Sequence, residues 1–190
     1  MILQTLINDS ICAASANVFS TMLGQELARG ETSLEAGTPE PNDGVVSFIG
    51  IAGAWAGTGS ISCSPNLACR ICSQMLMTDV SAVDAEVLDA VAELTNMIIG
   101  GVKTDLEQHL GPLGLSIPTV VYGRNFKTKS AGQHEWIVVN FLWDSEPLTV
   151  KFCLAPQDRT LVHHAINHTA ENHPYTIEVS TLMENSCHQQ

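Results

Sequence analysis

The segment DAVAELTNMIIGG, residues 89–101, decides how the rest of the chain is interpreted. Its two acids, Asp89 and Glu93, are four residues apart, and Asn96 follows three residues later. On an α-helix of 3.6 residues per turn, these three side chains share one face. Polar residues at this spacing are usually only the solvated face of an amphipathic helix, so the spacing alone assigns them no function.

The sequence around this segment predicts a long helix. Ser81 is a plausible N-cap for it, and the phrase GPLG after His109 ends it. Its apolar face consists of residues that recur at helical spacing: Val87, Val91, Leu94, Ile98 and Val102. Another helix is predicted to start at Pro65 after the N-cap Ser64. A further helix is predicted near the N-terminus, with Gly30 as its stop.

Segments rich in β-branched and aromatic residues predict strands. They are VVSFIGIAGAWAGTGSISCS (45–64), which reads as two strands broken by glycines, SIPTVVYG (116–123), EWIVVNFLW (135–143) and LTVKFCLA (148–155). The segment ETSLEAGTPEPNDG (31–44) is predicted to be a turn-rich connector. A few long helices combined with consecutive strands are typical of an α+β fold with an antiparallel or mixed sheet.

An internal repeat connects the two long helices. Ser10, Ala14 and Asn17 each lie 79 residues before a member of the polar face (89−10, 93−14 and 96−17). Pro39 and Pro118 share this offset (118−39), and each leads into strand-like sequence. The coincidence predicts a duplicated helix-plus-strands unit with approximate twofold symmetry. Because Ala14 stands where the acid would be, only the second copy keeps the full polar set.

The composition restricts the classes of partner. The 190 residues include 8 basic and 20 acidic side chains, and the net charge of −12 argues against binding to nucleic acid or to anionic membranes. No Lys or Arg lies between Ile71 and Val102, so the acids there serve solubility or form a docking surface for a basic partner. With neither a signal sequence nor an apolar run that could span a bilayer, we expect a cytoplasmic protein.

The six cysteines are therefore expected to be reduced thiols that pack as small apolar residues. Cys69 and Cys72 have C-x-x-C spacing but no second pair, so a structural role is favoured over a metal or redox role. The last 34 residues, 157–190, are His-rich. His164 and His168 could bind a metal on a helix, but no third ligand has a recognised spacing, so a polar appendage is favoured over a metal-binding sensor.

The polar face also resembles a family signature. Asp89-x-x-x-Glu93-x-x-Asn96, followed by Pro118 in LSIPTVVYG, is similar to the motif of the CheC/CheX/FliY phosphatases. The phrases ELTNMIIGGVKTDLE and NVFSTMLG are similar to CheX in particular. The resemblance covers roughly residues 1–155, and the predicted phosphatase domain is residues 1–156. It implies a CheC-like α+β fold and an enzyme that removes phosphate from the aspartate of a CheY-like response-regulator receiver domain.

By this resemblance, Glu93 pairs with the receiver's active-site lysine, and Asn96 holds a water in line with the phosphoryl group. Asp89 supports the helix face, and Pro118 shapes the strand that follows. CheC-type members carry the pair in both copies, so Ala14 implies that the first site is inactive. The family further implies a homodimer and no cofactor of the protein's own, since the receiver supplies Mg²⁺. A non-catalytic receiver-binding adaptor of the same fold is the alternative.

The residue chemistry agrees with such a reaction. An acyl phosphate is already activated, so placing one water is the main requirement. A carboxamide such as that of Asn96 both donates and accepts hydrogen bonds without ionising. Gly100, one turn further along, has two interpretations: it gives clearance for a partner's backbone, or it allows tight packing of the two long helices.

Overall fold

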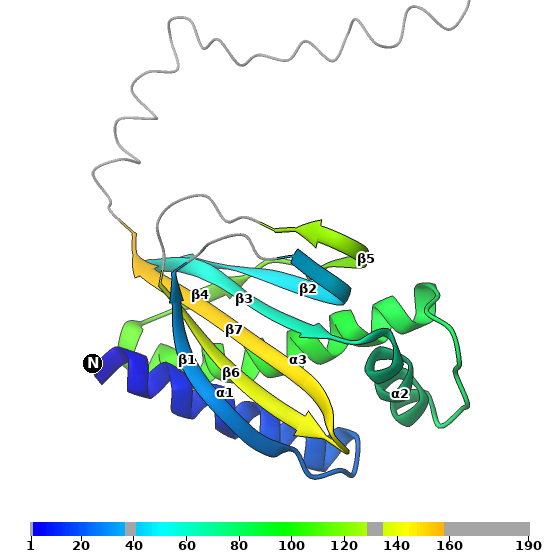
Figure 1. Cartoon of the computed structure of the whole chain (residues 1–190). Coiled ribbons are helices and arrows are strands. Elements are labelled where there is room, and N and C mark those ends of the chain that lie inside the picture. The colour runs from blue at the N-terminus through cyan, green and yellow to red at the C-terminus, as the bar shows by residue number, and fades with distance from the viewer. Residues whose placement is uncertain (1, 37–40, 129–134, 158–190) are drawn as a thin grey trace, which may run out of the picture. The chain divides into compact units, whose positions relative to one another are not determined.

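A computed structural model describes residues 2–36, 41–128 and 135–157 (Figure 1). Its helices are α1 (Ile2–Met22), α2 (Pro65–Leu76) and α3 (Ala85–Leu110). Its strands are β1 (Ala28–Ala36), β2 (Pro41–Gly53), β3 (Trp55–Cys63), β4 (Leu113–Leu115), β5 (Thr119–Lys127), β6 (Glu135–Trp143) and β7 (Glu146–Pro156). All strand pairs in the described residues are antiparallel, so the predicted α+β fold is confirmed and its sheet is of the antiparallel kind.

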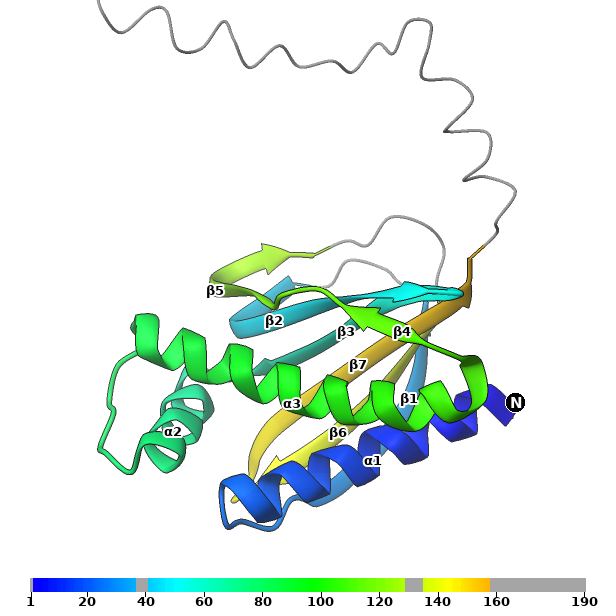
Figure 2. The same ribbon diagram turned by 180° about the vertical axis from the view of Figure 1, so that it is seen from behind.

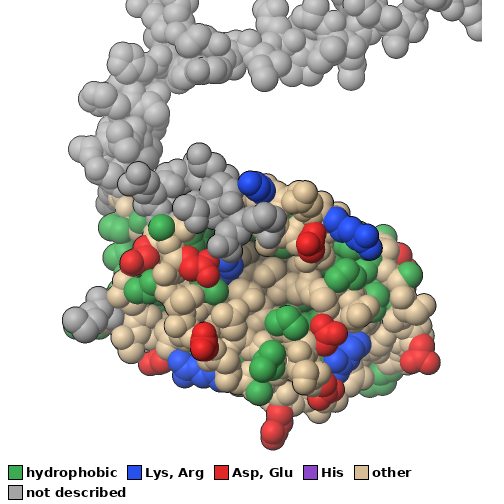
Figure 3. Space-filling view, viewed as in Figure 1, with side chains coloured by type: hydrophobic (Ala, Val, Ile, Leu, Met, Phe, Trp, Pro, Cys, Tyr) green, Lys and Arg blue, Asp and Glu red, His purple; other side chains and the backbone are tan. Residues whose placement is uncertain are grey.

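The helices lie on one face of the sheet, where α1 and α3 run side by side (Figure 2). The apolar face predicted for α3 is buried in this layer. It packs in one core with residues from the inner face of the sheet, such as Val45, Ile61 and Val150. Figure 3 shows the opposite face of the sheet, which is hollowed near its middle and has charged side chains around its rim. Because the apolar face of α3 is turned toward the sheet, its predicted polar face lies on the outer side of the helical layer.

The order of strands across the sheet supports the predicted duplication. It is β1-β6-β7-β3-β2, and β4 and β5 both pair with the free edge of β2. The centre of the sheet lies between β3 and β7. A twofold rotation about this centre places β3 on β7, β2 on β6 and β1 on β5. The chain therefore contains two copies of one helix followed by three strands, headed by α1 and α3.

The offset of 79 residues, which comes from the sequence of the two long helices, does not apply to the strands. The first residues of β1 and β5 are 91 apart (119−28), as are those of β3 and β7 (146−55). The second copy is longer because α3 has more residues than α1 and because the extra strand β4 follows α3. The predicted equivalence of Pro39 and Pro118 was therefore wrong: Pro39 itself lies outside the described residues, but it precedes β2, whereas Pro118 precedes β5.

Two helix ends and a connector were also predicted wrongly. α1 ends at Met22, and Gly30 lies in β1 rather than at a helix stop. The N-cap of α3 is Asp84 and not Ser81, because the Asp84 side chain accepts a hydrogen bond from the backbone N–H of Val87 at 3.0 Å. Most of the predicted connector is strand, in β1 and the start of β2. Nearly every side chain of β1 is exposed, so this edge strand lacks the alternation that signals a strand.

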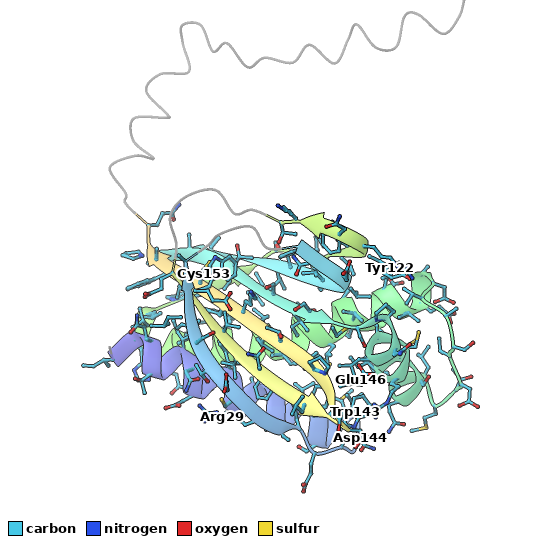
Figure 4. All side chains as sticks on the ribbon, in the orientation of Figure 1. Arg29, Tyr122, Trp143, Asp144, Glu146 and Cys153 are labelled. Carbon is cyan, nitrogen blue, oxygen red and sulfur yellow. The ribbon has the colours of Figure 1, made fainter. Side chains whose placement is uncertain are left out.

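The predicted start of α2 is confirmed, and polar contacts fasten this helix to the β6–β7 turn. The Ser64 hydroxyl accepts from the backbone N–H of Leu67 and donates to Glu146 at 2.8 Å. The Arg70 guanidinium lies 4.3 Å from the centroid of the Trp143 ring and forms a 2.6 Å ion pair with Asp144. Figure 4 labels these turn residues. Because α2 also packs against α3, these contacts help fix the N-terminal half of α3.

No helix within the described ranges combines the length and hydropathy that a bilayer crossing requires. Residues 158–190, which make up nearly all of the predicted His-rich extension, lie outside the described residues. The predicted boundary between residues 156 and 157 therefore stays a prediction.

Candidate functional site

The predicted polar residues gather on one exposed stripe of α3. Asp89, Glu93 and Asn96 are all exposed, whereas Thr95, next to Asn96, is fully buried. Within the described part of the chain, the side chains of Glu93 and Asn96 have no hydrogen-bond or ion-pair partner. A carboxylate and a carboxamide one turn apart are thus presented to solvent on a helix whose other face is held in the core.

The two glycines that follow have different surroundings. A Cβ atom on Gly101 would lie 2.9 Å from the Cβ of Ala14, so Gly101 allows the close approach of α1 to α3. A Cβ on Gly100 would have as its nearest neighbour the Cδ1 of Leu115, at 4.0 Å. The tight helix packing that we considered for Gly100 therefore belongs to Gly101, and the space above Gly100 is open.

The edge strand beside this stripe is interrupted at residues 116–118. β4 pairs with the end of β2 and β5 with its beginning, so the two short strands continue one another along the same edge. Between them, the Ser116 backbone N–H donates to the carbonyl of Gly50, and the Ser116 hydroxyl accepts from the Gly50 N–H, both at 2.9 Å. Pro118, which has no N–H, follows this break and suits an edge position. Its placement fits a role in shaping the start of β5.

Sequence reasoning missed Ser116 and a second anchor, Glu107. The Glu107 carboxylate accepts from the backbone N–H of Leu113 at 2.8 Å and forms a 2.9 Å ion pair with Lys103. The hydrogen bond from Leu113 and the ion pair hold the pKa of Glu107 below its usual value. These contacts fasten β4 to the end of α3 and so place Leu115 beside Gly100. A Ser two residues before a Pro, and an acid in the last turn of a helix, were the available sequence signals.

The first copy presents a different surface. Ser10 and Ala14 are buried, with exposed fractions of 5% and 7%, and only Asn17 is exposed. Ala14 contacts α3 at Gly101, as described above. Two of the three α1 residues at the offset of 79 are therefore buried, and one of them, Ala14, lies in the contact between the two long helices.

The cysteines and histidines offer no rival centre in the described residues. Cys12, Cys63, Cys69, Cys72 and Cys153 are free thiols, and all but the half-buried Cys12 are buried. Burial raises the pKa of Cys63 to about 12, which disfavours a nucleophilic thiolate. Nowhere in residues 2–36, 41–128 and 135–157 do three or more His, Cys, Asp or Glu side chains gather as a metal site would require. Cys187, His164 and His168 lie outside these ranges.

Comparison with known proteins identifies the family of this chain. The sequence profile of the family "Chemotaxis phosphatase CheX" matches residues 45–142. The CheY-P phosphatase CheX of Thermotoga maritima is 34% identical over 125 residues, which cover 63% of this chain and 79% of that protein. The crystal structure of the chemotaxis protein CheX from Desulfovibrio desulfuricans has a TM-score of 0.71 and 26% identity, with coverage of 78% of this chain and 99% of that one.

A complex is also among the similar structures. The CheX–CheY–BeF3–Mg²⁺ complex from Borrelia burgdorferi matches with a TM-score of 0.65 and 25% identity, over 77% of this chain and 96% of that chain. The family profile spans both α3 and the strands that flank it, and the T. maritima relative is matched over most of its length. The chain therefore belongs to the CheX family of chemotaxis phosphatases.

Proposed function

We propose that this protein hydrolyses the aspartyl phosphate of a CheY-like receiver domain, with Glu93 and Asn96 as the residues that enter the receiver's active site. The observation that carries the proposal is the exposed, unpartnered pair one turn apart on α3. The name of the T. maritima relative, a CheY-P phosphatase, and the CheX–CheY complex among similar structures support it.

Asn96 is proposed to position the attacking water. The acyl phosphate is a reactive bond, and fixing one water in line with it removes much of the entropic part of the barrier. A carboxamide can accept a hydrogen bond from the water while donating another to a phosphoryl oxygen. It does so without adding negative charge beside the phosphoryl group. The receiver's own Mg²⁺ is proposed to neutralise the developing charge, so that this protein needs no cofactor of its own.

Glu93 is proposed to pair with the receiver's active-site lysine. On a wet surface such an ion pair contributes only about 0–1 kcal/mol. Inside a partner's pocket the same pair is desolvated, fixes the register of the complex and thereby places Asn96 one turn away. Supporting roles follow from position: Asp89 extends the acidic stripe, and open Gly100 gives clearance to the partner's backbone. Pro118 shapes the neighbouring strand.

The test is the rate at which a phosphorylated receiver loses its aspartyl phosphate. Wild-type protein should accelerate this loss, and Asn96→Asp should lower the acceleration about 100-fold or more, because a carboxylate of nearly the same shape repels the phosphoryl group. The matched control is Gln108→Glu, the same amide-to-acid change at an exposed position in the last turn of α3. A wild type that binds the receiver without accelerating the loss would favour the adaptor function instead.

Two wider expectations belong to this proposal. A homodimer is proposed by resemblance, and the molar mass in solution tests it. A cytoplasmic location is proposed from the sequence, and fractionation of cells that express the full chain tests it.

A further inference from the structure

Ile117 is an apolar side chain that the fold holds in solvent. It lies in the break between β4 and β5 and is 86% exposed. Two large apolar side chains in the described residues are more exposed: Ile2, at the start of α1, and Met77, at the C-cap of α2. Ile117 instead lies inside the sequence, between two paired strands.

The backbone around Ile117 is fixed, so its exposure is built into the edge strand. On one side, Ser116 exchanges two hydrogen bonds with Gly50, and its hydroxyl is also placed to donate to the Ile117 carbonyl at 2.9 Å. On the other side, Pro118 restricts its own φ angle, and β5 begins at Thr119 opposite Phe48. A side chain between two such anchors cannot turn into the core without breaking the edge of the sheet.

Ile117 is two residues from a side chain that borders the proposed site. Leu115, two residues earlier, provides the nearest atom to the open space above Gly100, and Gly100 is one turn from Asn96. Further along the same edge, Tyr122 pairs with Val45 and is half exposed. Figure 4 labels Tyr122 on β5, near the N-terminal half of α3. The edge formed by β4 and β5, two strands that contact α3, therefore carries two exposed apolar side chains.

Charge and size argue for the receiver rather than a second copy as the occupant of this edge. The exposed acids of α3 are not balanced by any Lys or Arg between residues 71 and 102. A twofold contact between two copies at this edge would bring two acidic stripes into one interface, where like charges repel. Two exposed side chains also provide less apolar surface than a stable homodimer interface buries. A partner that offers a lysine to Glu93 has the complementary charge.

We propose that Ile117, with Tyr122 further along the same edge, is a docking contact that packs against an apolar patch at the rim of the receiver's active site while Glu93 and Asn96 enter that site. This inference rests on the proposed function, since it takes the receiver as the partner. The apolar contact contributes affinity, and the polar stripe contributes the chemistry. Ile117 is thus a positioning residue and touches no reacting atom.

The experiment compares Ile117→Ser with Ile2→Ser, the same change at an equally exposed site at the start of α1. The first readout is the affinity for a receiver domain activated with beryllofluoride and Mg²⁺, which cannot turn over. The second is the steady-state rate of aspartyl-phosphate loss. For Ile117→Ser we expect the dissociation constant and KM to rise about tenfold, as for the loss of one buried aliphatic contact, with kcat retained. Ile2→Ser should match the wild type, and Ile117→Leu should restore affinity.

Equal affinity of Ile117→Ser and wild type would overturn the docking contact and leave the proposed function standing. A wild type that binds but does not accelerate phosphate loss would overturn the proposed function, while weaker binding by Ile117→Ser would still support the contact. A change in the molar mass of Ile117→Ser, without a change in receiver affinity, would assign this edge to a second copy and overturn the inference.

Discussion

The two long helices occupy equivalent positions in the duplicated fold and present opposite surfaces. In α3, the Asp89, Glu93 and Asn96 side chains point to solvent. In α1, the residues at the same spacing include Ser10 and Ala14, which are buried. Ala14 meets α3 where Gly101 has no side chain. The copy that lacks the acid is therefore the copy whose corresponding face packs against its neighbour.

This difference shows that the first copy differs from the second in packing as well as in the missing acid. Replacing Ala14 with an acid would not by itself recreate a second exposed stripe, because the position is buried, with only 7% of its surface exposed. The two copies differ in how their helices pack in the core. Substitutions at the contact between α1 and α3 should therefore affect stability differently in the two helices.

The largest effect is expected from Ala14→Glu. The longer side chain overpacks the contact with Gly101 and brings a carboxyl group into it, so the free energy of unfolding should fall by about 3 kcal/mol. Chemical denaturation measures this loss. The control is Asn17→Glu, at the exposed position of the same helix, which should change the free energy by less than about 0.5 kcal/mol. An Ala14→Glu variant with wild-type stability and doubled phosphatase activity would break the comparison.

A smaller loss of folding stability is expected from Gly101→Ala. The added methyl group would lie 2.9 Å from the Cβ of Ala14, so the helices must move apart. The cost of overpacking, about 1–3 kcal/mol, outweighs the roughly 1 kcal/mol that alanine gains in helix propensity. Thermal unfolding measures the balance, and a raised melting temperature would mean that α1 and α3 are not in close contact here.

Gly100→Ala should raise the free energy of unfolding, whereas Gly101→Ala should lower it. Its Cβ would meet only Leu115 at 4.0 Å, so the helix propensity of alanine should stabilise the fold by about 1 kcal/mol. Affinity for the activated receiver should nevertheless fall, because the methyl group fills the proposed clearance. Stabilisation with unchanged affinity would remove Gly100 from the site and leave the fold account intact.

The smallest effect is expected at the anchor of α3 to β4. Because the pKa of Glu107 is lowered in the folded state, its contribution to stability is complete above the unfolded pKa of about 4.3 and is lost as the pH falls through the folded pKa. Glu107→Gln should therefore be less stable than wild type at neutral pH, and the difference should shrink in acid. Unfolding curves recorded from pH 7 down to about pH 3 test this. A difference that grows in acid would contradict the assigned hydrogen bond from Leu113.

Elements with a buried face could be predicted from the sequence, and elements without one could not. The apolar face of α3 was predictable because its members recur at helical spacing and all of them are buried. β1 was not predictable because its side chains are nearly all exposed. Asp84 could have been preferred to Ser81 as the cap, since Val83 before it and Leu88 both pack against the core, as in a hydrophobic staple.

The site was predictable only in part. The spacing of Glu93 and Asn96 placed them on one face, but the assignment of a role came from the resemblance to a family. Gly100 and Gly101 are indistinguishable in the sequence, and only the position of α1 separates them. The exposure of Ile117 depends on hydrogen bonds between Ser116 and Gly50, which are 66 residues apart. The local signal, a Ser two residues before a Pro, does not identify Gly50 as the partner of Ser116.

The most direct measurement compares Asn96→Ala in α3 with Asn17→Ala in α1, the same change at two positions 79 residues apart, in the loss of aspartyl phosphate from a receiver domain. Both side chains are exposed, so both variants should fold as the wild type does. We expect Asn96→Ala to lose most of the acceleration, about 100-fold or more, and Asn17→Ala to keep it. Full activity of Asn96→Ala, or equal losses in the two variants, would contradict a single working site on α3.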